Sequence, residues 1–430
     1  MNTQGHVGRV HLQVDRGFLH SGHLPTLVAA LLYFDVSFMV WVLLGPLAPF
    51  LRDEFGLSAT EQGLLVATPL LGGSLFRPVL GYLGDRIGGR RTGLLGLALT
   101  VIPLVAGWKL AHAAWHFYPL ALMLGIAGAS FAVALPLASR WYPPQYQGLA
   151  MGIAGAGNSG SLLATLAAPR LAERFGWANT FGLMLAPIAL VFVAFLLMAK
   201  DSPHRVARPS RRDYLGVLKD PDTLWFSILY SLTFGGFVGF TSFLTTFFHE
   251  QYGVARVSAG DFTTIVIVAG SLLRPVGGWL SDRIGGYRLL LFTFTGVCSC
   301  ILAVSVLPAL PVVIALLFVG VGLLGMGNGA VFQLVPQRFP DRMGIVTGIV
   351  GAAGGLGGFF LPSVLGATKD MSGSYSMGLQ LFAVAFLGGA LLLLQLGTVW
   401  KVRWRPDAVE QSGIFCVRGA VQNLFNNEAA

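Results

Sequence analysis

Two arginines stand inside otherwise apolar runs of the chain, and both have nearly the same neighbours. Residues 74–91 read SLFRPVLGYLGDRIGGRR and residues 271–288 read SLLRPVGGWLSDRIGGYR, so 13 of 18 positions are identical at an offset of 197 residues (271 − 74). A guanidinium keeps its charge in a protein, and its planar fork matches a planar oxyanion with two parallel hydrogen bonds. The pair, Arg77 and Arg274, therefore predicts a small-anion site to which each half of the chain contributes one arginine.

The depth of these arginines can be estimated from the helix rise. Arg77 lies eight residues before Asp85, and Arg274 lies eight residues before Asp282, where each apolar run ends. Eight residues of helix rise roughly 12 Å, which reaches nearly the middle of a hydrocarbon layer about 30 Å thick. A charge at that depth is costly, and a carboxylate or backbone carbonyls could neutralise it instead of a substrate. The symmetric occurrence of the pair favours the anion site.

One carboxylate is expected at a similar depth. Asp35, in the run LYFDVSF, lies eight residues past the start of the first span, again roughly 12 Å from the inner face. Asp35 could couple proton movement to transport, or it could be a static counter-ion or helix-packing partner. The eight histidines fall in loops, in the N-terminal segment or at helix ends, so a histidine relay is not expected.

The composition indicates an all-α integral membrane protein. Of 430 residues, 54% are hydrophobic and 11% are charged, against roughly 25% charged in soluble domains. The net charge of +9 resides in short loops between apolar runs, which argues against nucleic-acid binding. The three cysteines, Cys298, Cys300 and Cys416, form no disulfide framework or metal-ligand spacing. The sequence predicts neither a metal site nor a cofactor.

Apolar runs of about 20 residues predict twelve transmembrane helices in two parallel six-helix repeats. The predicted spans cover residues 27–50, 62–84, 93–111, 117–139, 148–169, 177–199, 223–248, 261–281, 288–307, 311–336, 344–366 and 377–399. They define an N-terminal segment (1–26), a first bundle (27–199), a linker (200–222), a second bundle (223–399) and a tail (400–430). An even number of helices in each half gives both halves the same orientation, so Arg77 and Arg274 should face each other across the centre.

The distribution of lysine and arginine among the loops predicts the orientation. The linker and the loops on its side are rich in arginine, whereas the opposite loops contain few basic residues, most of them near acids. By the positive-inside rule, both termini and the linker are expected in the cytoplasm. The N-terminal segment lacks the apolar core of a signal peptide, so the first span should remain as a helix of a protein in the cytoplasmic (inner) membrane.

Two glycine-rich stretches extend the internal repeat. MGIAGAGNSG covers residues 151–160 and TGIVGAAGGLGG covers residues 347–358, and small residues at this density allow neighbouring helices to approach closely. Ordinary tight packing is the other interpretation of such a stretch. Their glycines are Gly152, Gly155, Gly157 and Gly160, and Gly351, Gly354, Gly355, Gly357 and Gly358.

The chain resembles a known family at these positions. The loops GYLGDRIGGRR (81–91) and GWLSDRIGGYR (278–288) resemble the loop signature of the major facilitator superfamily. The glycine-rich stretches together with the intramembrane arginines are similar to the nitrate/nitrite porter family, over residues 27–400. The resemblance assigns a structural and conformational role to the loop residues, which could form ion pairs that hold one state: Gly81, Asp85, Arg86, Gly278, Asp282 and Arg283.

The same resemblance implies substrate contacts. Phe131 and Phe332 resemble the phenylalanines that sandwich the flat anion, and Tyr230 matches a substrate-contacting tyrosine. Asn158 occupies the polar position of the first glycine-rich stretch, and the second stretch has no equivalent asparagine. The two phenylalanines are not exact repeat mates, because the residue 197 positions after Phe131 is Asn328 (131 + 197).

The expected function is secondary transport of nitrate, nitrite or both by alternating access, through proton symport or nitrate/nitrite antiport. The alternatives are another small oxyanion or carboxylate on the same fold and, more remotely, a non-transporting sensor or a membrane enzyme. An enzyme would need a nucleophile or an acid–base pair held together, and the sequence offers no such set. The expected partners are the anion, protons in the case of symport, and the lipid bilayer, and the chain is expected to be a monomer.

Overall fold

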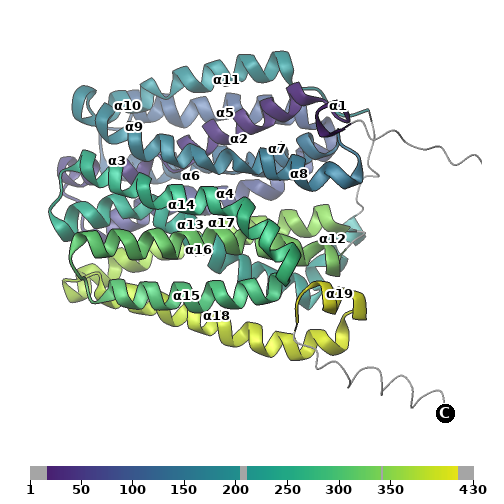
Figure 1. The fold of residues 1–430 in the computed structure, drawn as a ribbon. Helices are drawn as coiled ribbons and strands as arrows, with labels where there is room; N and C mark the ends of the chain where they lie inside the picture. Colours follow the sequence, from purple (N-terminus) through teal and green to yellow (C-terminus); the bar gives the residue numbers. More distant parts are fainter. Residues whose placement is uncertain (1–16, 204–210, 340–341, 415–430) are drawn as a thin grey trace, which may run out of the picture.

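The computed structural model describes residues 17–203, 211–339 and 342–414. Within these ranges the chain is helical, and its long helices lie side by side in one bundle (Figure 1). The predictions made for residues 1–16 and 415–430, including Cys416, lie outside the described residues. The expectation of an all-α membrane protein is confirmed.

The first six predicted spans are helical but contain several breaks. In chain order they comprise α2 (Leu24–Trp41) and α3 (Leu44–Phe55), α4 (Ala59–Ile87), α5 (Gly89–Lys109), η1 (Ala114–His116) with α6 (Phe117–Gly128) and α7 (Phe131–Ser139), α8 (Pro144–Gly155) with η2 (Ala156–Ser159) and α9 (Gly160–Phe175), and α10 (Trp177–Leu183) with α11 (Leu185–Met198).

The second six spans are unbroken helices, most of them longer than predicted because they extend past the apolar core. They are α13 (Pro221–Tyr252), α14 (Arg256–Ile284), α15 (Gly286–Ser305), α16 (Leu310–Arg338), α17 (Met343–Ser372) and α18 (Ser376–Arg403). Three short helices, α1 (Gly17–His20), α12 (Arg211–Lys219) and α19 (Pro406–Gln411), lie together at one end of the bundle (Figure 1). We call this the linker end and the opposite one the far end.

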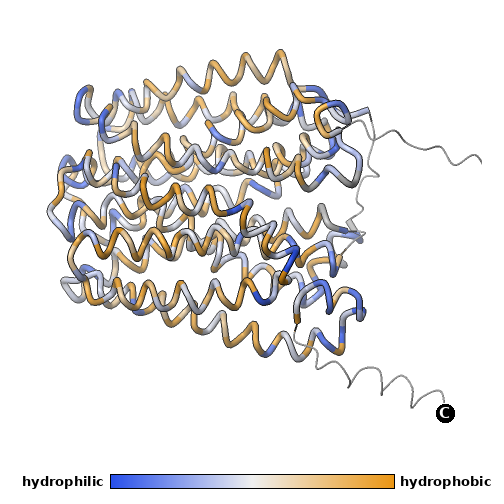
Figure 2. The backbone as a smooth tube through the Cα atoms, viewed as in Figure 1, coloured by the Kyte–Doolittle hydropathy of each residue, from blue (hydrophilic) through white to orange (hydrophobic). Residues whose placement is uncertain are grey.

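Eleven helical segments in the described chain are long and apolar enough to cross a membrane. The remaining predicted span, 148–169, is present as α8, η2 and α9, where glycines, Asn158 and Arg170 dilute the apolar character. Hydrophobic residues occupy the middle of the helices, and hydrophilic residues gather at both ends (Figure 2). Large apolar side chains such as Leu190 and Leu197 are exposed on the outside, as lipid contact requires.

Three helix pairs form the most extensive contacts between the two halves: α4 with α17, α9 with α14, and α3 with α13. Glycines permit the closest contacts, because a Cβ on Gly366 would collide with the carbonyl oxygen of Ala59, and one on Gly45 would collide with Ser242. Between α9 and α14, Gly260 likewise packs against the Thr165 carbonyl. The halves therefore meet backbone to backbone.

Ion pairs close the far end between the halves. Arg52 pairs with Glu250, Asp53 with Arg256, and Arg170 with Asp261. In addition, the carboxylate of Asp370 on α17 accepts hydrogen bonds from the first backbone N–H groups of α4. We call these four links the far-end clasp.

The linker end differs, because the ion pairs given for the described residues there join residues of the same half. Asp85 pairs with Arg140 at 2.6 Å in the first half, and Asp220 pairs with Arg338 at 3.0 Å in the second. Gly152, Gly155 and Gly348, on the linker-end parts of α8 and α17, have open space where a side chain would extend. The structure is therefore closed at the far end and more open at the linker end.

Candidate functional site

Arg77 lies on α4 in the centre of the bundle, and its side chain is buried, with 2% of the residue exposed. Nε donates to the carbonyl oxygen of Gly128 at 3.1 Å, and Nη1 donates to that of Gly351 on the other half. Nη2 makes no hydrogen bond to a described residue. Carbonyl oxygens orient the guanidinium but do not cancel its charge, and no ion pair within the described ranges includes Arg77.

Aromatic rings surround this guanidinium. Its central carbon lies 5.1 Å from the ring centroid of Trp41, 5.5 Å from that of Phe131 and 5.2 Å from that of Phe234. The indole of Trp41 is fixed by donating to the Pro69 carbonyl at 2.6 Å. Cation–π attraction stabilises the positive charge while one edge of the guanidinium stays available to an anion.

Arg274 lies on α14 and is half-buried, and its Nη1 is buried without a hydrogen-bond partner among the described residues. It is close enough to Arg77 and Tyr230 for its charge to act on both. The Tyr230 hydroxyl is buried as well and makes no hydrogen bond of good geometry to a described residue. The structure thus brings together the two arginines and the tyrosine that the sequence singles out.

Phe131 and Phe332 face each other from opposite halves. Their ring centroids are 6.5 Å apart and their planes differ by 27°. Aromatic rings in contact have centroids about 4.5–7 Å apart, so this pair stacks across the halves. Tyr230 joins the pair, with its ring centroid 4.8 Å from that of Phe332. The three rings form a flat aromatic surface beside Arg77.

The second glycine-rich stretch borders this site. The carbonyl of Gly351 holds Arg77, and a Cβ on Gly355 would lie 2.6 Å from Ser74 Oγ and 3.5 Å from Arg77 Nη1. Gly354 packs on the Tyr230 ring. The other members, Gly357 and Gly358, pack against Ser231 and Val238 of α13. Any side chain at 355 would enter the space beside the arginine.

The first glycine-rich stretch has a different role in the structure. Gly157 and Gly160 pack directly on the backbone of α2 at Asp35, where a Cβ at either position would collide with it. Asn158 is buried, and with its amide oriented for hydrogen bonding it donates to the carbonyls of Gly155 and Ala156 in its own turn. Its predicted contact with the substrate stays a prediction.

Asp35 is held at the break in the fifth span. Its Oδ1 accepts from Ser159 Oγ at 2.6 Å, and its carboxylate also accepts from the backbone N–H of Gly160, the first residue of α9. The ion pairs within the described ranges do not include one between Asp35 and Arg77. The carboxylate thus stabilises the positive N-terminal end of α9. The neighbouring residue, Phe34, connects Asp35 to the site, since its ring centroid lies 5.5 Å from that of Phe131.

The loop motifs lie at the linker end. Asp85 pairs with Arg140 rather than with its neighbour Arg86, which lies 5.3 Å over the ring of Tyr82. In the second half, Arg283 lies 4.1 Å over the ring of Trp279, and Asp282 is exposed. Gly81 and Gly278 have no close backbone neighbour. The charged loop residues lie at least eight positions along α4 and α14 from the arginines, whereas Gly81 and Gly278 lie only four positions from them. Their conformational role stays a prediction.

Sequence reasoning missed three residues beside the arginine: Trp41, Phe234 and Ser74. The two rings stack on each other across the halves with centroids 6.5 Å apart, and Ser74 Oγ donates to Ala352 O at 2.6 Å. A tryptophan or phenylalanine in an apolar run is indistinguishable from a core residue. The only available signal was the repeat, which places a serine three residues before each arginine.

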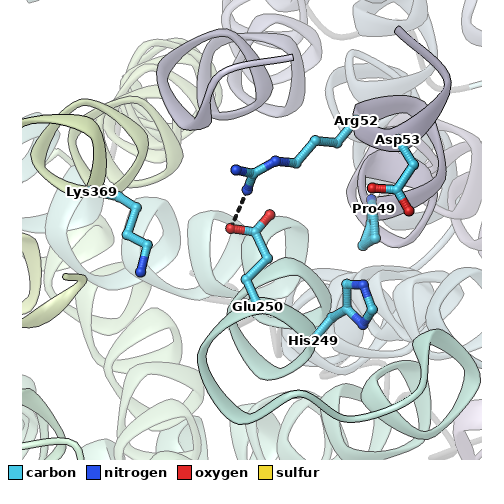
Figure 3. Close-up of a pocket in the computed structure, with 6 residues that line it drawn as sticks. All are labelled: Pro49, Arg52, Asp53, His249, Glu250 and Lys369. Carbon is cyan, nitrogen blue, oxygen red and sulfur yellow. Dashed lines mark ion pairs between the residues drawn. The ribbon is translucent and has the colours of Figure 1, made fainter. Parts of the chain in front are cut away.

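A cavity of about 290 Å³ lies at the far end, away from the arginines. Figure 3 shows the Arg52–Glu250 ion pair across this cavity, with Lys369 and His249 pointing toward it from α17 and α13. Arg52, Asp53 and Glu250 in its lining belong to the far-end clasp, so this cavity is part of the closure and lies apart from Arg77 and Arg274.

Comparisons with known proteins agree with this geometry. The family model of the Major Facilitator Superfamily matches residues 29–362. A D-xylose-proton symporter structure aligns with TM-score 0.72 at 16% identity, covering 90% of this chain and 98% of that one. A bacterial homologue of the lysosomal transporter Spinster, in an inward-facing and occupied conformation, aligns with TM-score 0.70 at 19% identity, covering 88% and 98%. These two likenesses show the fold.

Curated relatives match most of the chain. A probable nitrate/nitrite transporter NarK2 of Mycobacterium tuberculosis is 38% identical, over 85% of this chain and 94% of that protein. A nitrite extrusion protein of Bacillus subtilis is 34% identical over 87% and 94%. A probable nitrate/nitrite antiporter NarK1 of Thermus thermophilus is 32% identical over 87% and 92%. The chain is a multi-pass membrane transporter that belongs to the nitrate/nitrite porter family of the major facilitator superfamily.

Proposed function

We propose that the chain transports nitrate, nitrite or both, by alternating access of the central site to the two ends of the bundle. The observation that carries the proposal is Arg77: a buried guanidinium with no carboxylate partner in the described chain and one unpartnered N–H edge, beside the stacked pair Phe131 and Phe332. The names of the curated relatives support the same substrates.

The charges suggest how binding drives the cycle. Arg77 and Arg274 come from different halves, so their repulsion opposes closure of the linker end around an empty site. A bound anion offsets part of this repulsion and attracts both guanidinium groups. We therefore expect the linker end to close only around an anion, while the far-end clasp opens.

The most direct test is counterflow of labelled nitrate in proteoliposomes that contain the purified chain. Arg77→Lys and Arg274→Lys keep the charge but lose the two-pronged geometry, and each should reduce uptake at least tenfold, since hydrogen bonds to charged groups contribute about 1.5–3 kcal/mol. Transport retained by both variants would refute the paired-arginine mechanism. If excess nitrate and nitrite fail to compete with the transported anion, another small oxyanion or a carboxylate is the substrate.

Asp35 provides the proposed route to proton coupling. Protonation of its carboxylate would weaken its contact with Ser159 and the start of α9. Asp35 is on α2, and the ring of its neighbour Phe34 packs on Phe131, so α2 connects Asp35 to the site. Asp35→Asn should abolish the dependence of uptake on an imposed pH gradient while leaving nitrate counterflow intact. If the gradient dependence persists in Asp35→Asn, or is absent in the wild type, nitrate/nitrite antiport is the better description.

The proposed orientation follows from the basic loops at the linker end. We propose that this end faces the cytoplasm, in the cytoplasmic membrane, with both termini on that side and the chain acting as a monomer. Under this orientation the structure is inward-facing. Modification of single cysteines at the linker end in right-side-out and inside-out vesicles tests the orientation.

A further inference from the structure

Asn328 on α16 is fully buried, and neither its amide nitrogen nor its amide oxygen makes a hydrogen bond to a described residue. A buried amide without partners is unfavourable, and such groups are rare in native proteins. Two unpartnered atoms on one side chain indicate that a group from outside the described chain hydrogen-bonds to Asn328 during the transport cycle.

The position of Asn328 along α16 is fixed by two glycine contacts. Gly325 packs on the backbone of Gly270 in α14, and Gly329 packs on the carbonyl oxygen of Arg274 and the backbone nitrogen of Gly278. Asn328 therefore lies at the level of Arg274 on the neighbouring helix.

The direction of the side chain follows from helix periodicity. Residues four positions apart lie on the same face of a helix, so Asn328 shares a face with Phe332. That face borders the central aromatic group, because Phe332 stacks on Phe131 and contacts Tyr230. Gly327, on the adjoining face, packs instead on Thr233 and Thr293.

Other buried polar atoms of the second half share this property. Ser271 Oγ and Arg274 Nη1 are buried and make no hydrogen bond to a described residue, and Tyr230 Oη is held only by a contact of poor geometry with Arg274. Tyr230 is on α13, and Ser271 and Arg274 are on α14, two helices that α16 contacts. The second half thus presents a group of unpartnered donors around the level of Arg274.

We infer that Asn328 is a further substrate-binding residue, whose amide nitrogen donates a hydrogen bond to a small oxyanion held by Arg274, while its oxygen accepts from a neighbouring hydroxyl. This inference rests on the proposed function. It also gives the repeat a meaning, because the residue at the same position of the first half is Phe131 (328 − 131 = 197). The anion would meet a ring from one half and an amide from the other at equivalent positions.

The test compares isosteric variants in proteoliposomes, using nitrate and nitrite separately. Asn328→Leu removes both polar atoms, and loss of a hydrogen bond to a charged ligand should raise the KM roughly tenfold to hundredfold with little change in maximal rate. Asn328→Asp keeps the shape but places a carboxylate beside the anion, so its defect should be larger. Thr293→Val is the matched control, since this buried side chain packs on Gly327 on the adjoining face of α16 and its hydroxyl donates to the Leu323 carbonyl. The KM of this variant should equal the wild-type value.

A stability measurement separates binding from a structural role. Without anion, Asn328→Leu should melt at or above the wild-type temperature, because two unsatisfied atoms are removed, and the increase in melting temperature caused by nitrate should be lost. A structural role predicts instead a lower melting temperature without anion and a preserved KM.

The outcomes distinguish this inference from the proposed function. If the wild type transports neither nitrate nor nitrite, the proposed substrates are wrong. The KM of Asn328→Leu is then compared with that of the wild type for the anion that the wild type does transport. If the wild type transports an anion and Asn328→Leu keeps its KM and anion-induced stabilisation within twofold, the assignment of Asn328 is wrong.

Discussion

Glu250 is the most buried acid of the far-end clasp, and replacing it with glutamine should open that end. Its side chain is 11% exposed against 33% for its partner Arg52 on the other half, and it also accepts from the Tyr375 hydroxyl at 2.6 Å. The Tyr375 contact stays within one half and persists when the halves separate. Only the contact with Arg52 distinguishes the closed from the open far end.

The expected magnitude lies between two limits. Exposed ion pairs contribute about 0–1 kcal/mol, and breaking a fully buried pair by removing one partner costs about 3–5 kcal/mol. Because one partner is buried and the other is a third exposed, we take about 1.5 kcal/mol for Glu250→Gln. That energy shifts the ratio of closed to open far ends about tenfold.

Alkylation of a buried cysteine measures this shift. Thr246 on α13 is fully buried, and Gln62 of the other half donates to its hydroxyl at 3.5 Å. In a background whose native cysteines are replaced by serine, Thr246→Cys should react about tenfold faster with an impermeant thiol reagent when Glu250→Gln is added. Glu54→Gln, at an exposed acid of the same end, is the control. Equal rates for the two variants would refute the clasp.

Three further predictions follow from the same contacts. Gly160→Ala should lower the melting temperature by several degrees because its Cβ collides with α2, whereas Gly155→Ala, with open space at that position, should leave it nearly unchanged; equal effects would contradict the packing. The Arg170–Asp261 pair is bidentate, at 2.7 and 2.9 Å, but partly exposed. Arg170→Asp and Asp261→Arg should therefore each speed alkylation at the far end by about twofold to fivefold. The double variant restores an ion pair and should return to the wild-type rate. Burial and Lys200 lower the pKa of His23 below its usual 6.5, so its cap on α2 is intact above pH 6.5 and is lost as the pH falls through the lowered value. Between about pH 7.5 and 5 the wild type should therefore lose up to about 1 kcal/mol of stability relative to His23→Asn, whose neutral cap does not titrate. Thermal melts across this pH range measure the loss, and parallel pH profiles of the two proteins would contradict the prediction.

The sequence by itself determined the membrane spans and the two parallel halves, and it predicts the depth of the two arginines. These features are local, because hydropathy reports burial in lipid residue by residue and an exact offset maps one half on the other. The family likeness added Phe131, Phe332 and Tyr230. The structure places Phe131 and Tyr230 beside the arginines and Phe332 against both of these rings.

The tertiary structure decided which groups meet. It turns Asn158 toward the carbonyls of its own turn, places Asp35 at the start of α9 instead of beside Arg77, and leaves Asn328 without a partner in the described chain. It also joins Arg52 to Glu250, which are almost two hundred positions apart in the chain. Such pairings depend on the rotation and register of helices from distant parts of the sequence, and close backbone contacts between those helices set both.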